Sequence, residues 1–126
     1  MSPTELCRSY LASFATGDPE QIAAHVADGF VNEHTAALGG GCIGIDEYRQ
    51  RLPKFLASMP GLRYEQEEIV AEGDRVMAAY TMHAVVNERD IAIRGVMRFR
   101  VEGDKIARTY HVEDWQGAFR QMSAAK

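Results

Sequence analysis

The second half of the chain alternates apolar and polar residues over several strand-length segments, and this pattern limits the fold more than any other feature. The expected strands cover residues 62–71, 75–86, 91–101 and 105–113. Short turns join them, and two of these turns carry the same triplet, Glu-Gly-Asp, at 72–74 and 102–104. Because glycine and aspartate tolerate the backbone angles of tight turns, the pattern predicts an antiparallel β-meander.

Helix signals fill the first half of the chain. The string Ser-Pro-Thr-Glu at 2–5 combines an N-cap, a proline at the first helical position and a capping box, so it starts the first helix. The string Asp-Pro-Glu-Gln at 18–21 repeats this signal, and the second helix is expected to end at Asp-Gly 28–29. A third helix is expected over 45–59, where Pro53 predicts a kink or a break.

A short strand and a loop separate the second and third helices. The strand, over 30–35, places Asn32 and His34 on one of its faces. Residues 36–44 contain four glycines, which predicts a loop at the rim of a pocket or a lid over it.

This order of elements predicts a single α+β domain over residues 1–126, closed by a short helix over 115–122. We expect a cone-shaped, curved antiparallel sheet wrapped around the amino-terminal helices, with a pocket inside the cone. The strand 75–86 is apolar on both faces, so its outer face predicts an interface with a second copy in a homodimer.

Alternation along the last strand predicts which of its side chains face the pocket. Counting from Ile106 places Tyr110 and Asp114 on the inner face. The same count places His111 on the outer face of the sheet, and alternation in the second strand of the meander places His83 there too.

The charge balance excludes several classes of protein. The chain has 18 acidic and 14 basic residues and a net charge of −4, which is no footprint for nucleic acid. No apolar stretch is long enough to span a membrane and the amino terminus lacks a signal-peptide pattern, so we expect a cytoplasmic protein. Cys7 and Cys42 are too few for a disulfide framework and predict reduced thiols.

Three groups of residues stand in a fixed order along the chain. Gly17-Asp18 precedes the short strand, Gly-Val-Met-Arg-Phe-Arg-Val at 95–101 is followed by Gly-Asp-Lys-Ile at 103–106, and Asp-Trp-Gln-Gly-Ala-Phe-Arg-Gln-Met occupies 114–122. In this order they resemble the SnoaL-like branch of the nuclear-transport-factor-2-like superfamily, which has the fold of ketosteroid isomerase. The resemblance implies a fold that hosts isomerases, cyclases, hydrolases and non-catalytic modules.

The resemblance implies roles for three residues, and each has a structural alternative. Asp114 matches the general acid/base of SnoaL-like cyclases, and alternatively it caps the closing helix. His34 falls where ketosteroid isomerase carries its catalytic base, and alternatively it is a half-buried strand histidine. Tyr10 matches an oxyanion-hole tyrosine, and alternatively it packs in the core with its hydroxyl hydrogen-bonded.

The remaining pocket residues are expected to bind rather than to react. Asn32 is expected to hydrogen-bond a ligand carbonyl or a water. The other residues expected to contact a substrate are aromatic or methionine: Tyr48, Phe55, Tyr80, Met82, Met97, Phe99, Tyr110 and Trp115. Residues 80–82 lack the Arg-x-Asp pair of epoxide hydrolases, and the short turn at 87–90 argues against a large polyketide substrate.

Two hypotheses from different classes remain. The first is a cofactor-independent enzyme in which Asp114, with or without His34, moves a proton on an apolar carbonyl compound as an isomerase, aldol-type cyclase or dehydratase. The second is a non-catalytic dimeric module that binds a small ligand or a partner in the same cone. They differ in whether the Asp114 carboxylate faces an open cavity or caps the closing helix. Neither uses a metal ion, because Glu33 and His34 with a distant Asp114 lack a third well-spaced ligand.

Overall fold

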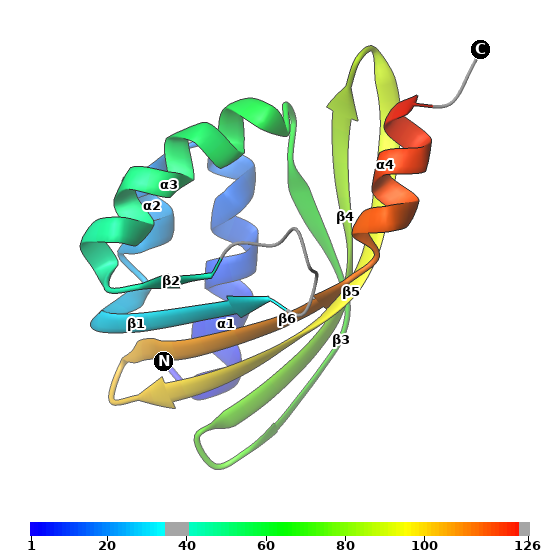
Figure 1. Cartoon of the computed structure of the whole chain (residues 1–126). Helices are drawn as coiled ribbons and strands as arrows, with labels where there is room; N and C mark the ends of the chain where they lie inside the picture. The colour runs from blue at the N-terminus through cyan, green and yellow to red at the C-terminus, as the bar shows by residue number, and fades with distance from the viewer. Residues whose placement is uncertain (35–40, 124–126) are drawn as a thin grey trace.

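The computed structural model describes residues 1–34 and 41–123 (Figure 1). Its helices are α1 (Pro3–Ser13), the 3₁₀ turn η1 (Phe14–Thr16), α2 (Pro19–Ala23), α3 (Ile45–Ser58) and α4 (Trp115–Ser123). Its strands are β1 (Val26–His34), β2 (Cys42–Ile43), β3 (Arg63–Glu72), β4 (Arg75–Val86), β5 (Arg89–Glu102) and β6 (Lys105–Glu113). Most of the expected glycine-rich loop lies outside the described residues, and its described end contains β2.

The strands form one sheet in the order β2-β1-β6-β5-β4-β3. Figure 1 shows the sheet curving around α1, α2 and α3, while α4 lies against β5 beyond the end of β6. The expected α+β cone is therefore confirmed. One detail differs, because β1 runs parallel to β6 while all other neighbours are antiparallel, so the sheet is mixed. The first strand enters beside the last one, and alternation within a strand carries no information about that pairing.

Both predicted helix starts are confirmed. The Ser2 hydroxyl accepts a hydrogen bond from the Glu5 N–H at 3.1 Å, and the Ser2 N–H donates to Glu5 Oε1 at 3.1 Å, which completes the capping box. The Asp18 carboxylate accepts from the Glu20 N–H at 2.9 Å and caps α2. These caps fix the directions in which α1 and α2 enter the cone.

One expected helix end is wrong, and one of two alternatives at Pro53, a break in the helix, does not occur. Helix α2 ends at Ala23, earlier than expected, because Val26 already pairs with Ile106 of β6. The Ile106 N–H donates to the His25 carbonyl at 2.9 Å, so sheet pairing satisfies the backbone that a longer helix would have used. Helix α3 continues through the exposed Pro53, so no break occurs there.

Three two-residue turns build the meander, and the one at 87–88 is shorter than the expected turn at 87–90. Gly73 and Gly103 sit in the two Glu-Gly-Asp turns with φ of 60° and 61°, a backbone conformation that favours glycine. Asn87 and Glu88 form the turn between β4 and β5 and also have positive φ, 53° and 64°. The two consecutive positive φ angles at Asn87 and Glu88 match the twist of a hairpin, so this turn sets the register of β4 against β5.

One extra residue in β6, Ala107, decides which side chains of that strand face the helices. Arg108 pairs with Arg100 of β5, whereas Ile106 pairs with Val101, so Ala107 is a β-bulge. Past the bulge, the residues on the inner face are Thr109, His111 and Glu113. Strict alternation from Ile106 therefore gives the wrong face for the end of this strand.

The core lies between the inner face of the sheet and the helices. The inner faces of β4 and β5 follow the predicted alternation, with buried Val76, Ala78, Tyr80, Met82, Ala84, Ile91, Ile93, Met97, Phe99 and Val101. Helix α1 packs Leu6, Cys7, Tyr10 and Leu11 against them. This packing fills one end of the cone and leaves the other end hollow.

Candidate active site

The hollow end of the cone is a cavity of about 420 Å³. Helices α1 and α3 form one wall, the ends of β1 and β6 form another, and α4 closes the side beyond them. Most of the wall is aromatic, aliphatic or sulfur-containing: Tyr10, Phe14, Cys42, Tyr48, Leu52, Phe55, Met59, Tyr64, Met82, Trp115, Phe119 and Met122. The polar groups on the wall are few and concentrated at the strand ends.

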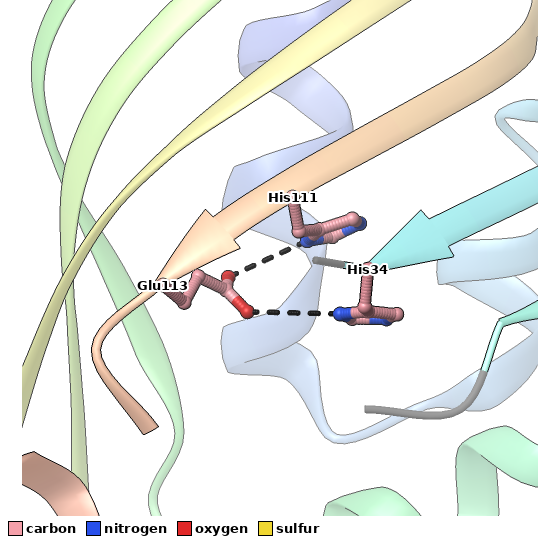
Figure 2. Close-up of side chains that lie close together, drawn as sticks. All are labelled: His34, His111 and Glu113. Atoms are coloured by element: carbon pink, nitrogen blue, oxygen red, sulfur yellow. Dashed lines mark hydrogen bonds and ion pairs between the residues drawn. The ribbon is translucent and has the colours of Figure 1, made fainter. Parts of the chain in front are cut away.

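Two imidazoles and a carboxylate meet at those strand ends (Figure 2). Glu113 Oε2 lies 3.4 Å from His111 Nδ1, and Glu113 Oε1 lies 4.0 Å from His34 Nδ1. The two imidazole rings stack with centroids 4.4 Å apart and an interplanar angle of 21°. We call His34, His111 and Glu113 the His–Glu cluster.

The sheet register assembles this cluster. His34 is the last residue of β1 and pairs directly with His111 across the parallel β1–β6 ladder. Glu113 follows His111 by two residues, so both side chains project from the same face of β6. Three functional side chains thus converge from two neighbouring strands.

The Glu113 carboxylate is fixed by two further hydrogen bonds. The Tyr80 hydroxyl donates to Oε2 at 2.5 Å, and the Trp115 indole N–H donates to Oε1 at 3.0 Å. Gly95 leaves room for this arrangement, because an added Cβ would lie 2.6 Å from Glu113 Cγ. The Glu113 side chain is only 2% exposed, and these hydrogen bonds hold its carboxylate in one orientation.

Burial and hydrogen bonding oppose each other at Glu113. Burial alone raises the pKa of this carboxyl, but the hydrogen bond and charge of His111, the Tyr80 hydroxyl and nearby His34 together hold the pKa below its usual value. Burial lowers the pKa of His34 to about 4, with His111 and Arg51 acting in the same direction. At neutral pH the cluster therefore contains an ionised carboxylate and a neutral His34.

A pair of tyrosines adds hydrogen-bond donors to the cavity wall. The hydroxyls of Tyr10 and Tyr48 hydrogen-bond to each other, and both rings are almost fully buried. Burial raises the pKa of both phenols, so both remain protonated at neutral pH. One hydroxyl hydrogen makes the bond between the rings, which leaves the other to be donated to a ligand oxygen.

Three other polar residues line the cavity: Asn32, Arg51 and Ser58. Asn32 accepts a hydrogen bond from the Thr109 hydroxyl through Oδ1 at 3.0 Å, which leaves its N–H₂ group to donate. Arg51 donates to the Gly41 carbonyl at 2.6 Å and forms an ion pair with Glu47 at 2.8 Å.

Most of the residues expected to contact a substrate do line the cavity: Tyr10, Asn32, His34, Tyr48, Phe55, Met82 and Trp115. Tyr80 reaches the site through its hydrogen bond to Glu113. Met97 and Phe99 are buried in the core beside the cavity and do not line it. Tyr110 projects from the opposite face of β6, where the Arg98 guanidinium lies 4.9 Å from its ring centroid.

Asp114 lies at the start of α4 and not on the cavity wall. Its carboxylate accepts a hydrogen bond from the Gly117 N–H at 2.8 Å, and its carbonyl accepts from the Ala118 N–H at 3.1 Å. An added Cβ on Gly117 would lie 2.1 Å from Asp114 Oδ2, so glycine is needed beside this cap. The structure favours the helix-capping alternative for Asp114, and the pocket carboxylate is its neighbour Glu113.

The expectation that His111 faces outward is wrong, and Glu113 was not expected in the pocket. Both errors have the same cause. The bulge at Ala107 inverts the faces of every later residue in β6. The available signal was the His-x-Glu spacing at 111–113, which puts two chemically active side chains on one strand face. His83 does lie on the outer face as expected, 2.8 Å from Glu65.

Replacing Asp114 by alanine is expected to cost about 1 kcal/mol of stability through loss of the cap, and to leave ligand binding in the cavity unchanged. Urea denaturation and the fluorescence of the single tryptophan, Trp115, measure these two quantities. Asp18→Ala is the matched control, because Asp18 caps α2 in the same way. If Asp114→Ala folded normally but lost ligand binding, Asp114 would have to be part of the binding site.

The same cluster bears on metal binding. Ligand atoms of His34, His111 and Glu113 all lie within 4.8 Å of one another. The expectation of no metal site depended on the lack of a third well-spaced ligand. That argument does not hold, because the structure places two further ligands, His111 and Glu113, beside His34.

The cone-shaped sheet, the mostly apolar cavity and the polar cluster on its wall define an α+β pocket protein of the ketosteroid-isomerase-like fold class. The family comparison agrees: the SnoaL-like domain matches residues 7–109, and the chain belongs to this family. No match was found among curated proteins. No helix in the described part of the chain is long and apolar enough to cross a membrane.

Solved structures share this fold over nearly the whole chain. A putative SnoaL-like polyketide cyclase from Shewanella denitrificans OS-217 has a TM-score of 0.85 at 16% identity and covers 98% of each chain. A protein with a ketosteroid isomerase-like fold from Catenulispora acidiphila DSM 44928, in complex with trimethylamine, has a TM-score of 0.86 at 13% identity, covering 96% of this chain and 94% of that one. TerC, co-crystallized with polyporic acid, has a TM-score of 0.83 at 20% identity, covering 98% and 100%. At these identities the likeness establishes the fold.

Proposed function

We propose that the chain is a small-molecule enzyme that moves a proton on an apolar carbonyl compound bound in the cavity. The observation that carries the proposal is the His–Glu cluster, in which a buried carboxylate faces two imidazoles on the wall of an apolar cavity. Fold neighbours that hold trimethylamine and polyporic acid support occupation of such a cavity by a small molecule. Asp114 has no part in this proposal, because its carboxylate is committed to the cap of α4.

The proposed reaction begins with removal of a proton from the carbon next to the carbonyl. The neutral His34 imidazole accepts that proton, and the resulting imidazolium faces the Glu113 carboxylate. The electron pair of the broken C–H bond forms an enolate. A hydroxyl of the Tyr10–Tyr48 pair donates a hydrogen bond to the enolate oxygen.

The imidazolium then returns the proton. Return to a different carbon of a conjugated substrate completes an isomerisation. Attack of the enolate carbon on a second carbonyl, with the proton delivered to the new alkoxide, completes an aldol-type cyclisation. The cavity volume of about 420 Å³ limits the substrate to a compound of modest size.

The test is deuterium incorporation from D₂O into enolisable ketones, followed by NMR on EDTA-treated protein. Wild type is expected to accelerate exchange of a ketone that also quenches Trp115 fluorescence, and His34→Gln to lower the rate by about a hundredfold or more. His83→Gln is the matched control, because His83 also faces a carboxylate but lies outside the cavity. Binding with equal exchange rates in wild type and His34→Gln would instead support a non-catalytic ligand-binding module.

We also expect a homodimer through the outer face of the sheet. Val96 of β5 and Val112 of β6 are directly paired there and are 45% and 51% exposed, and Met77 of β4 is 50% exposed. Contiguous exposed apolar side chains of this kind favour a second copy as the partner. Sedimentation should give the dimer mass for wild type and for the control Lys54→Asp, which changes an exposed residue of α3 away from that face, and the monomer mass for Val96→Asp. A monomeric wild type at micromolar concentration would contradict the expectation.

A further inference from the structure

We infer that His34, His111 and Glu113 form a binding site for one divalent first-row transition-metal ion such as Zn²⁺ or Co²⁺. The inference uses the same cluster as the proposed function but does not depend on the reaction proposed for it. An ion held there takes the imidazole and carboxylate lone pairs that would otherwise accept a proton. Metal loading is therefore expected to stop proton transfer.

Strand geometry places the three ligands on one side of the bound ion. His111 and Glu113 alternate with Val112 and so project from one face of β6. His34 is the direct partner of His111 across the β1–β6 ladder. Two imidazoles and one carboxylate arranged in this way form a three-ligand set that leaves the remaining coordination positions open.

The distances fit a site that closes on an ion. The ligand atoms lie within 4.8 Å of one another, with 3.4 Å between His111 Nδ1 and Glu113 Oε2. Bonds of about 2.0–2.1 Å to Zn²⁺ in tetrahedral geometry place ligand atoms about 3.4 Å apart. The His111–Glu113 pair already has this spacing. The His34 nitrogen lies 4.0 Å from Glu113 Oε1, and the largest separation in the set is 4.8 Å, so His34 must approach by about 0.6–1.4 Å.

The surroundings of Glu113 match those of a metal-bound carboxylate. Hydrogen bonds from the Tyr80 hydroxyl and the Trp115 indole fix the carboxylate from outside the cluster. Gly95 keeps space free beside the Glu113 side chain. The open coordination positions face the cavity, where a water or a ligand oxygen can complete the shell.

The donor set also selects the class of ion. Imidazole nitrogens favour Zn²⁺, Co²⁺, Ni²⁺ and Fe²⁺ over Mg²⁺ and Ca²⁺, which prefer oxygen ligands. We therefore expect Zn²⁺ and Co²⁺ to bind and Mg²⁺ at the same concentration to leave the site free.

The test starts from protein dialysed against EDTA. Titration with Co²⁺, followed by visible absorption, is expected to show one ion per chain, with release when Zn²⁺ is added. His34→Gln and His111→Gln should each weaken binding by about tenfold or more, whereas the control His83→Gln should leave it unchanged. Equal Co²⁺ affinity in wild type, His34→Gln and His111→Gln would overturn the inference.

A second measurement protects the test against variants that fold poorly. Zn²⁺ should raise the thermal unfolding midpoint of wild type and His83→Gln, but not that of His34→Gln, whose side chain lies at the cavity wall. An equal rise in wild type and His34→Gln would count against the site. The deuterium exchange assay separates the two proposals. Metal binding without exchange in EDTA-treated protein supports the metal site and overturns the proposed reaction. Exchange without metal binding supports the proposed reaction and overturns the metal site.

Discussion

Replacing Glu113 by leucine is expected to lower the free energy of unfolding by about 3–5 kcal/mol. Leucine fills a similar volume but accepts no hydrogen bond. The Tyr80 hydroxyl and the Trp115 indole N–H would then lose their acceptor in a buried site, and each unsatisfied donor costs about 1–3 kcal/mol. His111 would lose its carboxylate partner as well. Urea denaturation of EDTA-treated protein measures the change.

Two variants separate the causes of this loss. Glu113→Gln keeps one acceptor oxygen, so we expect it to cost about half as much as leucine. Glu67→Leu is the matched control, because Glu67 also accepts from a hydroxyl, that of Thr81, but lies on the outer face of the sheet. We expect a much smaller cost there, because solvent replaces the lost hydrogen bond at an exposed carboxylate. Equal costs for the two leucine variants would mean that Glu113 is not the centre of a buried network.

Lowering the pH from 7 to 4 is expected to remove about 2 kcal/mol of stability through His34 alone, after allowance for the solvent that reaches its ring. The pKa of His34 is about 4 in the folded chain, against an ordinary histidine pKa of 6.5. Below pH 6.5 the unfolded chain binds a proton that the folded chain does not. The stabilisation is therefore complete above pH 6.5 and is lost progressively down to about pH 4.

The measurement is a series of urea denaturation curves at several pH values for EDTA-treated wild type and His34→Gln. The difference between the two proteins isolates His34, because His111 is present in both. Glu113 adds a further loss below pH 4.5, since the network holds its pKa below that value. Parallel pH profiles for wild type and His34→Gln would contradict the assignment of a neutral, desolvated His34.

Local sequence signals predicted most of the fold. The capping box at Ser2 and the cap at Asp18 depend on residues three positions apart or fewer, so the sequence contains all of the needed information. The same holds for the turns at Gly73 and Gly103, whose strands ended within a residue or two of the expected positions. Features set by distant partners were not predictable. The parallel β1–β6 pairing and the early end of α2 at Ala23 both depend on contacts between residues far apart in the chain.

The candidate site was predicted only in part, because part of it also depends on pairing between strands far apart in the chain. Tyr10 lies on the apolar stripe of helix α1 and His34 lies at the end of β1, and both line the cavity. The resemblance to SnoaL-like cyclases points to Asp114 as the pocket carboxylate, and strict alternation carried through Ala107 places Asp114 on the inner face. A bulge depends on how β6 pairs with β5, and period-two counting along one strand cannot detect it.

The bulge at Ala107 also bears on how such a pocket changes during evolution. The last strand carries two sets of side chains, His111 and Glu113 on one face and Tyr110 and Val112 on the other. A single-codon deletion at Arg108 that keeps the bulge would exchange the two sets, replacing a polar wall by an aromatic and aliphatic one while the hairpin turn stays in place. Deletion of Ala107 itself would only remove the bulge, and His111 and Glu113 would still pair with Met97 and Gly95 and face the cavity. One insertion or deletion in this strand can therefore remove the His–Glu cluster from the cavity wall. Aligning relatives of this chain without regard to the bulge would pair residues that face opposite sides of the sheet.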